Sequence, residues 1–220
     1  MCGRYIVLNS EAIQQLFSVL PPDDWQDRFN VAPSQDVPTV RLIEGQRVLT
    51  LMRWGLIPRF AQGVAGNFST INARVETIRT SAAYREPWRK GQRCLVLASA
   101  FYEWQEVPGG KQPHYIGCAD QEVFAFAGLW DGSTPSGGVP ILSCTIVTLP
   151  ASPLMAQIHN TRQREPAILR PEDHDIWLKG SSEAAFACLR QYPDELRSAW
   201  PVSTQVNSPK NQGPALMARL

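Results

Sequence analysis

Strand-like segments follow one another through the middle of the chain. Each is an apolar run of aliphatic, β-branched or aromatic residues, and Gly, Pro or Asp residues separate one run from the next. Runs of this kind with turn residues between them are typical of strands joined by short connections. The runs are Val37–Leu42, Arg47–Met52, Cys94–Ala98, Phe101–Val107, His114–Cys118, Val123–Trp130 and Ser143–Leu149. The sequence therefore predicts a fold dominated by β-structure.

Helical patterns lie on either side of these strands. Ser10–Leu20 opens with a capping candidate, carries apolar side chains at helical spacing and ends before two prolines. Further helices are predicted over Pro153–Ile158, Pro171–Leu178 and Ser182–Leu189. The Gly- and Pro-rich stretch Asp131–Pro140 lies between two strands, which indicates a loop inside one domain. We expect one α+β domain over residues 1–220, with a predominantly antiparallel, partly barrel-like β-sheet and surrounding helices.

Composition narrows the classes of function. The net charge of +1 gives no sign of a polyanion-binding surface, so any nucleic-acid contact must come from a local arginine cluster. We find no signal-peptide pattern and no membrane-spanning apolar stretch, so no membrane partner is expected. The five cysteines have no metal-like spacing and fit a reduced, cytoplasmic setting, with Cys94 and Cys144 as core residues. Neither a metal nor an organic cofactor is implied.

The chain begins Met1-Cys2-Gly3-Arg4, and this start carries distinctive chemistry. Loss of Met1 would leave Cys2 with a free α-amine beside its thiol. An amine condenses with an aldehyde to an imine, and a thiolate is a strong nucleophile, so the two groups could close a thiazolidine on one carbon. Reference pKa values of ~8 for the amine and ~8.5 for the thiol leave part of each deprotonated at neutral pH. Arg4 is expected to favour the thiolate.

Two segments place polar or aromatic residues in an unusual way. Asn72, Arg74 and Glu76 alternate with apolar residues, so that one face of an extended segment is polar; a solvated edge strand also explains this pattern. Arg53–Pro58 combines a tryptophan with a Gly and Pro turn. This segment could offer a stacking surface for bases, and a core tryptophan is the alternative.

Two further residues are candidates for proton transfer. Glu103 lies between aromatic residues in Phe101–Trp104, which could desolvate its carboxylate and raise its pKa into the range of a general acid. An exposed glutamate on an amphipathic strand is the alternative. His159 follows a short apolar segment predicted to be helical, and imidazole is the side chain suited to proton transfer near neutral pH. A structural or capping histidine explains the same position.

Taken together, these segments resemble one family over nearly the whole chain. They are the N-terminal Met-Cys-Gly-Arg, Arg28–Pro33, Arg53–Pro58, Ile71–Thr77, Phe101–Trp104, Ile158-His159 and Val202-Ser203 followed by Asn207–Asn211. This order resembles that of the SRAP proteins, the SOS response-associated peptidase family. The resemblance implies a sensor of abasic sites in single-stranded DNA that crosslinks itself to the lesion during the DNA damage response. In such a protein Cys2 would form the thiazolidine with the open sugar.

The resemblance also implies roles for other residues. Glu103 would be the acid or base that serves the sugar and the amine, His159 a second proton carrier, and Asn72 would orient the sugar or the Cys2 amine. Candidate phosphate contacts are Arg4, Asn30 and Arg74, and candidate stacking or wedging residues are Trp54, Ile57, Pro58 and Trp104. Where the family pattern reads arginine-methionine-proline after the histidine, this chain has Glu165 before Pro166, so we expect the local charge to differ.

Two other classes of function remain open from the sequence. The family name suggests an N-terminal-nucleophile peptidase or amide hydrolase, in which Cys2, His159 and Asn72 form the reacting set. A non-covalent single-strand binder would not need Cys2 at all. Reversal of the crosslink and strand scission by β-elimination are further activities of the same imine. The compact length is typical of a bacterial member, which we expect to be monomeric and associated with the nucleoid when bound to DNA.

Overall fold

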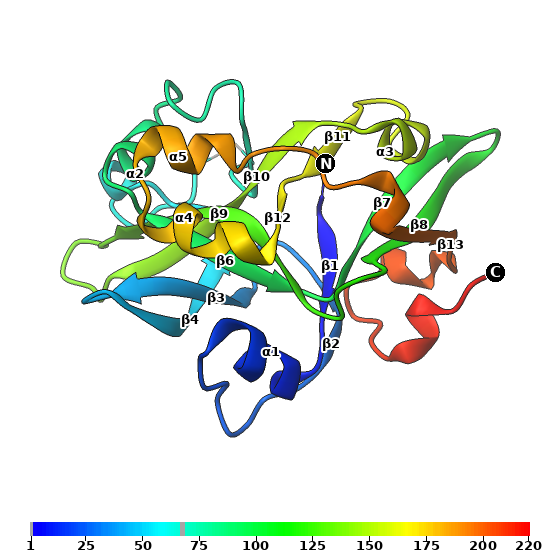
Figure 1. Cartoon of the computed structure of the whole chain (residues 1–220), viewed down its shortest axis with the longest axis horizontal. Coiled ribbons are helices and arrows are strands. Elements are labelled where there is room, and N and C mark those ends of the chain that lie inside the picture. Colours follow the sequence, from blue (N-terminus) through cyan, green and yellow to red (C-terminus); the bar gives the residue numbers. More distant parts are fainter. Residues whose placement is uncertain (1, 67–68) are drawn as a thin grey trace.

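A computed structural model describes residues 2–66 and 69–220, whose strands form two sheets with short helices around them (Figure 1). The larger sheet has eight strands. They are β3 (Asp36–Ile43), β4 (Gln46–Trp54), β5 (Asn72–Arg74), β6 (Arg93–Ala98), β9 (Phe124–Ser133), β10 (Ile141–Pro150), β11 (Arg164–Pro166) and β12 (Ile168–Leu169). Pairings run from β10 through β4, β3, β6 and β9 back to β10, so these strands form a ring. The expected partly barrel-like, mainly antiparallel sheet is confirmed.

The strands of the ring pack closely at Gly128 in β9. This residue pairs with Cys94 of β6 on one side and with Ile146 of β10 on the other. A Cβ placed on Gly128 would lie 2.8 Å from both Cys94 Sγ and Val96 Cγ2. Glycine is therefore required here because two neighbouring backbones and their side chains approach too closely for a methyl group.

The smaller sheet has the strand order β13-β8-β7-β1-β2. The bounds are β1 (Arg4–Val7), β2 (Arg28–Val31), β7 (Ala100–Val107), β8 (Gly110–Cys118) and β13 (Arg197–Pro201). Strand β1 pairs with β2 on one side and β7 on the other. In Figure 1 it runs between the ring and the β7–β8 hairpin. The N-terminal strand thus lies in the middle of the molecule, which brings Cys2 to the junction of the two sheets.

The helices are short, and all except α2 lie at predicted positions. They are α1 (Ser10–Phe17), α2 (Arg85–Arg89), α3 (Pro153–Ile158), α4 (His174–Lys179) and α5 (Ser182–Ala187). Helix α1 ends earlier than expected, because Ser18 adopts a left-handed conformation with φ 55° and its N–H bonds to Gln14 O. Helix α3 has the predicted bounds, so His159 does follow its last residue.

A large apolar core fills the ring and continues toward β1. Tyr5 of β1 packs edge-on against Trp54 of β4, with ring centroids 5.2 Å apart. Cys94 and Cys144 are fully buried in this core, as predicted. In the part of the chain that the structure describes, no helix combines the length and apolar character needed to cross a membrane.

Candidate active site

Cys2 lies two residues before the start of β1, and its side chain is fully buried. Its carbonyl oxygen accepts a hydrogen bond from Asn72 Nδ2 at 2.9 Å, which ties the start of the chain to β5. Burial raises the pKa of the Cys2 thiol far above its ordinary value, and the negative charge of Glu103 raises it further. The thiol is therefore protonated at neutral pH in this enclosed state.

The expectation that Arg4 favours the Cys2 thiolate is wrong. The Arg4 guanidinium donates to Asn30 Oδ1 at 2.9 Å, to Val206 O at 2.7 Å and to Asn207 O at 3.0 Å. These bonds aim its charge at the C-terminal segment, while burial controls the pKa of the thiol. Arg4 instead fastens β1 to the turn at residues 204–207.

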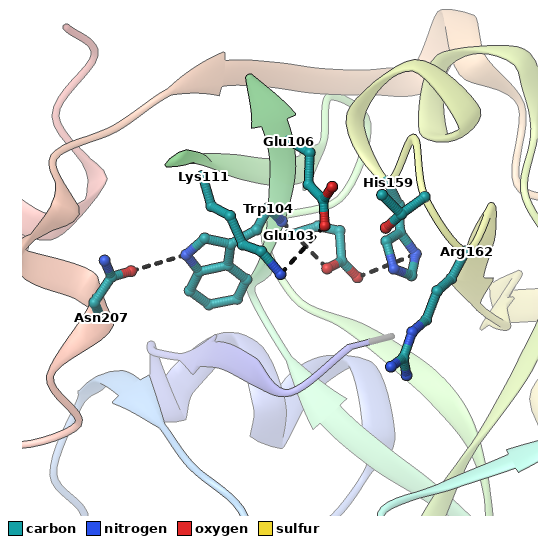
Figure 2. Close-up of a pocket in the computed structure, with 8 residues that line it drawn as sticks. Glu103, Trp104, Glu106, Lys111, His159, Arg162 and Asn207 are labelled. Atoms are coloured by element: carbon teal, nitrogen blue, oxygen red, sulfur yellow. Dashed lines mark hydrogen bonds and ion pairs between the residues drawn. The ribbon is translucent and has the colours of Figure 1, made fainter. Parts of the chain in front are cut away.

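Glu103 and His159 face each other across the site. Glu103, on β7, is only 3% exposed and His159 only 4% exposed, so the alternative of an exposed glutamate is wrong. Glu103 Oε1 accepts from Trp104 N at 3.2 Å, and Glu103 Oε2 lies 3.7 Å from His159 Nδ1 (Figure 2). His159 Nδ1 also lies 2.9 Å from Arg164 O. Arg164 N donates to the same ring nitrogen at 3.3 Å, so the Arg164 backbone holds the imidazole in place.

Asn72 reaches the site from β5, an edge strand that pairs with β10. Its backbone carbonyl accepts from Tyr84 OH at 3.2 Å, which holds the strand from its other side. Asn72 Oδ1 is buried, and within residues 2–66 and 69–220 it has no hydrogen-bond donor. An amide oxygen in this situation is ready to accept a bond from a group that arrives with a substrate or from a newly exposed amine.

Two cavities open beside these residues. The first, of about 560 Å³, is lined by Glu103 and His159 together with Trp104, Glu106, Lys111, Thr161, Arg162 and Asn207 (Figure 2). The second, of about 580 Å³, is lined by Asn72, Arg74, Pro58 and Phe60 among others. The carbonyl oxygen of Cys2 is hydrogen-bonded to Asn72, which lines the second cavity. The negative charge of Glu103, which lines the first cavity, raises the pKa of the Cys2 thiol. The N-terminal cysteine therefore connects the two linings.

The remaining predicted contact residues divide into two groups. Arg74 is exposed in the second cavity, Pro58 lines that cavity, and Trp104 lines the first, where its Nε1 donates to Asn207 Oδ1 at 2.8 Å. Asn30 and Trp54, by contrast, are fully buried. Asn30 Nδ2 donates to three carbonyl oxygens of the segment 206–211, and Trp54 Nε1 donates to Ile71 O at 3.0 Å. Their side chains support the site from the interior and are not accessible to a DNA strand in this structure.

Sequence reasoning missed the cations of the first cavity. Lys111, at the start of β8, and Arg162, in the turn after His159, both line it and are exposed. Arg162 lies three residues beyond His159, which is a signal that could have been used. Lys111 has no local signal, because it reaches the cavity only through the pairing of β7 with β8. Among the described residues, no cluster of His, Cys, Asp or Glu side chains could hold a metal ion.

A buried N-terminal cysteine beside an amide, a carboxylate and an imidazole defines an aminothiol or N-terminal-nucleophile site. The sequence matches the family described as "SOS response associated peptidase (SRAP)" over residues 1–209. The chain belongs to this family.

Similar proteins span bacteria and vertebrates. The abasic site processing protein YoqW of Bacillus subtilis is 35% identical over 225 residues, covering 99% of each chain. The abasic site processing protein HMCES of Xenopus tropicalis is 33% identical over 229 residues, which cover 90% of this chain and 68% of that protein. A crystal structure of a Bordetella bronchiseptica protein has a TM-score of 0.82 with 27% identity, covering 92% of this chain and 100% of that one.

Proposed function

We propose that this protein senses abasic sites in DNA and bonds covalently to them through Cys2 once Met1 has been removed. The observation that carries the proposal is the environment of Cys2. Its carbonyl oxygen is hydrogen-bonded to Asn72, and the buried carboxylate of Glu103 is close enough to raise the pKa of its thiol. An abasic deoxyribose opens to an aldehyde, the electrophile that an aminothiol captures. The names of the similar proteins YoqW and HMCES support the same lesion as the target.

The chemistry begins at the amine because the enclosed thiol is protonated. The Cys2 amine adds to the C1′ aldehyde to give a carbinolamine, which loses one water to form an imine. The thiol then adds across the C=N bond: sulfur bonds to C1′ and the thiol proton passes to nitrogen. The product is a thiazolidine whose mass is that of protein plus DNA minus one water.

Each proton transfer has a group suited to it. Glu103 protonates the departing hydroxyl of the carbinolamine and takes the proton from the thiol as the ring closes. His159 lies 3.7 Å from that carboxylate and exchanges protons with it. Asn72 Oδ1 accepts a hydrogen bond from the Cys2 amine and orients its lone pair toward the sugar. A neutral amide performs this task without adding charge beside a buried thiol.

The two cavities give the strand a path on either side of the lesion. Arg74 in the second cavity and Arg162 and Lys111 in the first are exposed cations that would pair with flanking phosphates. Pro58 and Trp104 present flat surfaces to neighbouring bases. The substrate is single-stranded, because an unpaired nucleotide can turn its sugar toward the buried Cys2. The protein acts as a monomer, since one chain supplies every residue of the site, and its place of action is the DNA of the nucleoid.

The test is the intact mass of purified protein, with Met1 verifiably absent, after incubation with a single-stranded oligonucleotide that carries one abasic site. We expect an adduct equal to protein plus DNA minus one water. Cys2→Ala should form no adduct, and Cys144→Ala, which alters another fully buried thiol, should react like the wild type.

Two further substrates sharpen the result. An oligonucleotide whose aldehyde has been reduced to an alcohol should not react, and the same lesion placed within a duplex should react more slowly. Absence of an adduct from aldehyde-bearing single strands would refute the proposal and direct attention to amide hydrolysis.

A further inference from the structure

Three charged side chains that the proposed chemistry does not use lie together behind the segment that carries His159. Glu165 Oε1 and Arg197 Nη2 form an ion pair at 2.6 Å, and both side chains are 0% exposed. Asp194 adds a second carboxylate, whose Oδ1 lies 3.8 Å from Arg197 Nε. The Asp194 side chain is partly exposed, at 28%. Glu165, Asp194 and Arg197 are named the charged cluster below.

Both carboxylates of the charged cluster bind the start of α3. Glu165 Oε2 accepts from Ser152 N at 2.7 Å. Asp194 accepts from Ser152 Oγ at 2.5 Å and from Leu154 N at 2.9 Å. Helix α3 is only six residues long, and His159 follows its last residue. The cluster therefore fixes the first turn of the same short helix whose end holds the imidazole.

The cluster also fixes the strand that orients the imidazole. Glu165 belongs to β11, where the backbone of the preceding residue, Arg164, contacts His159 Nδ1 through its O at 2.9 Å and its N at 3.3 Å. Arg197 belongs to β13 at the edge of the smaller sheet, while β11 belongs to the larger one. One ion pair thus links the helix before His159, the strand after it and the two sheets on which His159 and Glu103 depend.

The cluster is poorly arranged for stability alone. Within the described part of the chain, Arg197 Nε and Nη1 are buried without a hydrogen-bond acceptor. Burying an ion pair removes both charges from water, and well-packed apolar residues often serve stability as well or better. Groups with this penalty are better explained by a conformational task. Apart from the bond from Arg197 Nη2 to Tyr192 O at 3.2 Å, the hydrogen bonds of the cluster go to the start of α3, the helix before His159.

We propose that Glu165 and Arg197 are positioning residues, which hold His159 in the orientation toward Glu103 that proton transfer requires. The inference rests on the proposed function, because its readout is the reaction at Cys2. If the inference holds, a substitution in the cluster lowers the reaction rate through His159 and leaves the binding of the DNA strand unchanged.

The experiment measures the rate of adduct formation against the concentration of abasic single-stranded oligonucleotide for wild type, Glu165→Gln, His159→Gln and the double variant. Glutamine keeps the shape and an acceptor for Ser152 N while removing the charge. We expect Glu165→Gln to lower the maximal rate at least about tenfold, because general acid–base catalysis depends on placement. The half-saturating DNA concentration should stay unchanged. In the His159→Gln background the same substitution should change the rate less than about twofold.

Asp173→Asn is the matched control, because Asp173 is a buried carboxylate paired with Arg190 at 2.7 Å at the start of α4. It should leave the rate unchanged. If circular dichroism shows that Glu165→Gln is unfolded, Arg197→Lys replaces it with the same expectations, since lysine keeps the charge but lacks the guanidinium fork.

An equal loss in both backgrounds, or a folded variant with the wild-type rate, would overturn the inference and leave the proposed function intact. A wild-type protein that forms no adduct would overturn both.

Discussion

Protonation of His174 should destabilise the fold strongly at acidic pH. The ring is 3% exposed and stacks on Phe17 of α1 with centroids 5.2 Å apart. Burial lowers the pKa of His174 to about 4, from 6.5 in an exposed histidine, and the positive charge of Arg47 lowers it further. Nearby carboxylates oppose this shift without cancelling it; they are Asp173, Asp175 and Glu172.

The direction and the size of the change in the free energy of unfolding follow from the pKa values of His174 in the folded and the unfolded chain. Above pH 6.5 the ring is neutral in both the folded and the unfolded chain, and its packing contributes fully. As the pH falls from 6.5 to about 4, the unfolded chain binds the proton first, so the free energy of unfolding decreases. A difference of about 2.5 pKa units corresponds to about 3 kcal/mol, a large part of the stability of an ordinary domain.

The assay is urea denaturation followed by tryptophan fluorescence at several pH values for wild type and His174→Gln. Glutamine does not titrate, so the difference between the two proteins isolates His174 from other groups, including His114, whose pKa burial also lowers. The advantage of the wild type should shrink by about 3 kcal/mol between about pH 7.5 and pH 4. If the free energies of unfolding of the two proteins changed in parallel with pH, the reasoning would be refuted, because protonation of a buried neutral imidazole must cost stability.

Three further predictions concern the site and the ring. Glu103→Gln should slow adduct formation about 100-fold or more with unchanged binding to intact strands, measured by gel shift; faster reaction would contradict its role. Arg74→Gln should lower the salt dependence of single-strand affinity by about 0.7 in log–log slope, and an unchanged slope in a salt titration would exclude a phosphate contact. Gly128→Ala should lower the free energy of unfolding by about 1–3 kcal/mol, because its Cβ meets two side-chain atoms at 2.8 Å. Urea denaturation checks this against Gly132→Ala, whose Cβ meets no atom closer than 3.5 Å and should change little.

Much of the fold follows from local patterns. The apolar runs predicted for β3, β4, β6, β7, β8, β9 and β10 agree with the strands to within a few residues at their ends. Strand β5 lies in the segment whose alternation indicated an extended or edge strand. The short strands β1, β2, β11, β12 and β13 were not predicted, because two to five residues carry little periodic pattern. The prediction of one domain over residues 1–220 stays a prediction.

Some features of the site could likewise be predicted from local sequence, while others depend on contacts between distant segments. The type and position of Cys2 alone indicate its chemistry, and the helix predicted over Pro153–Ile158 agrees with α3, which ends directly before His159. The burial of Asn30 and Trp54 could not be predicted, because a polar or aromatic residue in a short motif does not reveal whether it faces solvent or the interior. Arg4 was misjudged for a related reason: proximity in sequence to Cys2 did not set the direction of its guanidinium.

The sequence by itself predicted the longer strands, the residue types of the site and the aminothiol chemistry at Cys2. Only the tertiary structure decided that Asn72, Glu103 and His159 meet around that residue, and that Glu165 and Arg197 share one buried contact. Periodicity and turn residues act over a few positions, so they specify individual elements. Which distant strands pair, and which charges are buried together, depends on packing the whole core at once, and no short stretch of sequence carries that information.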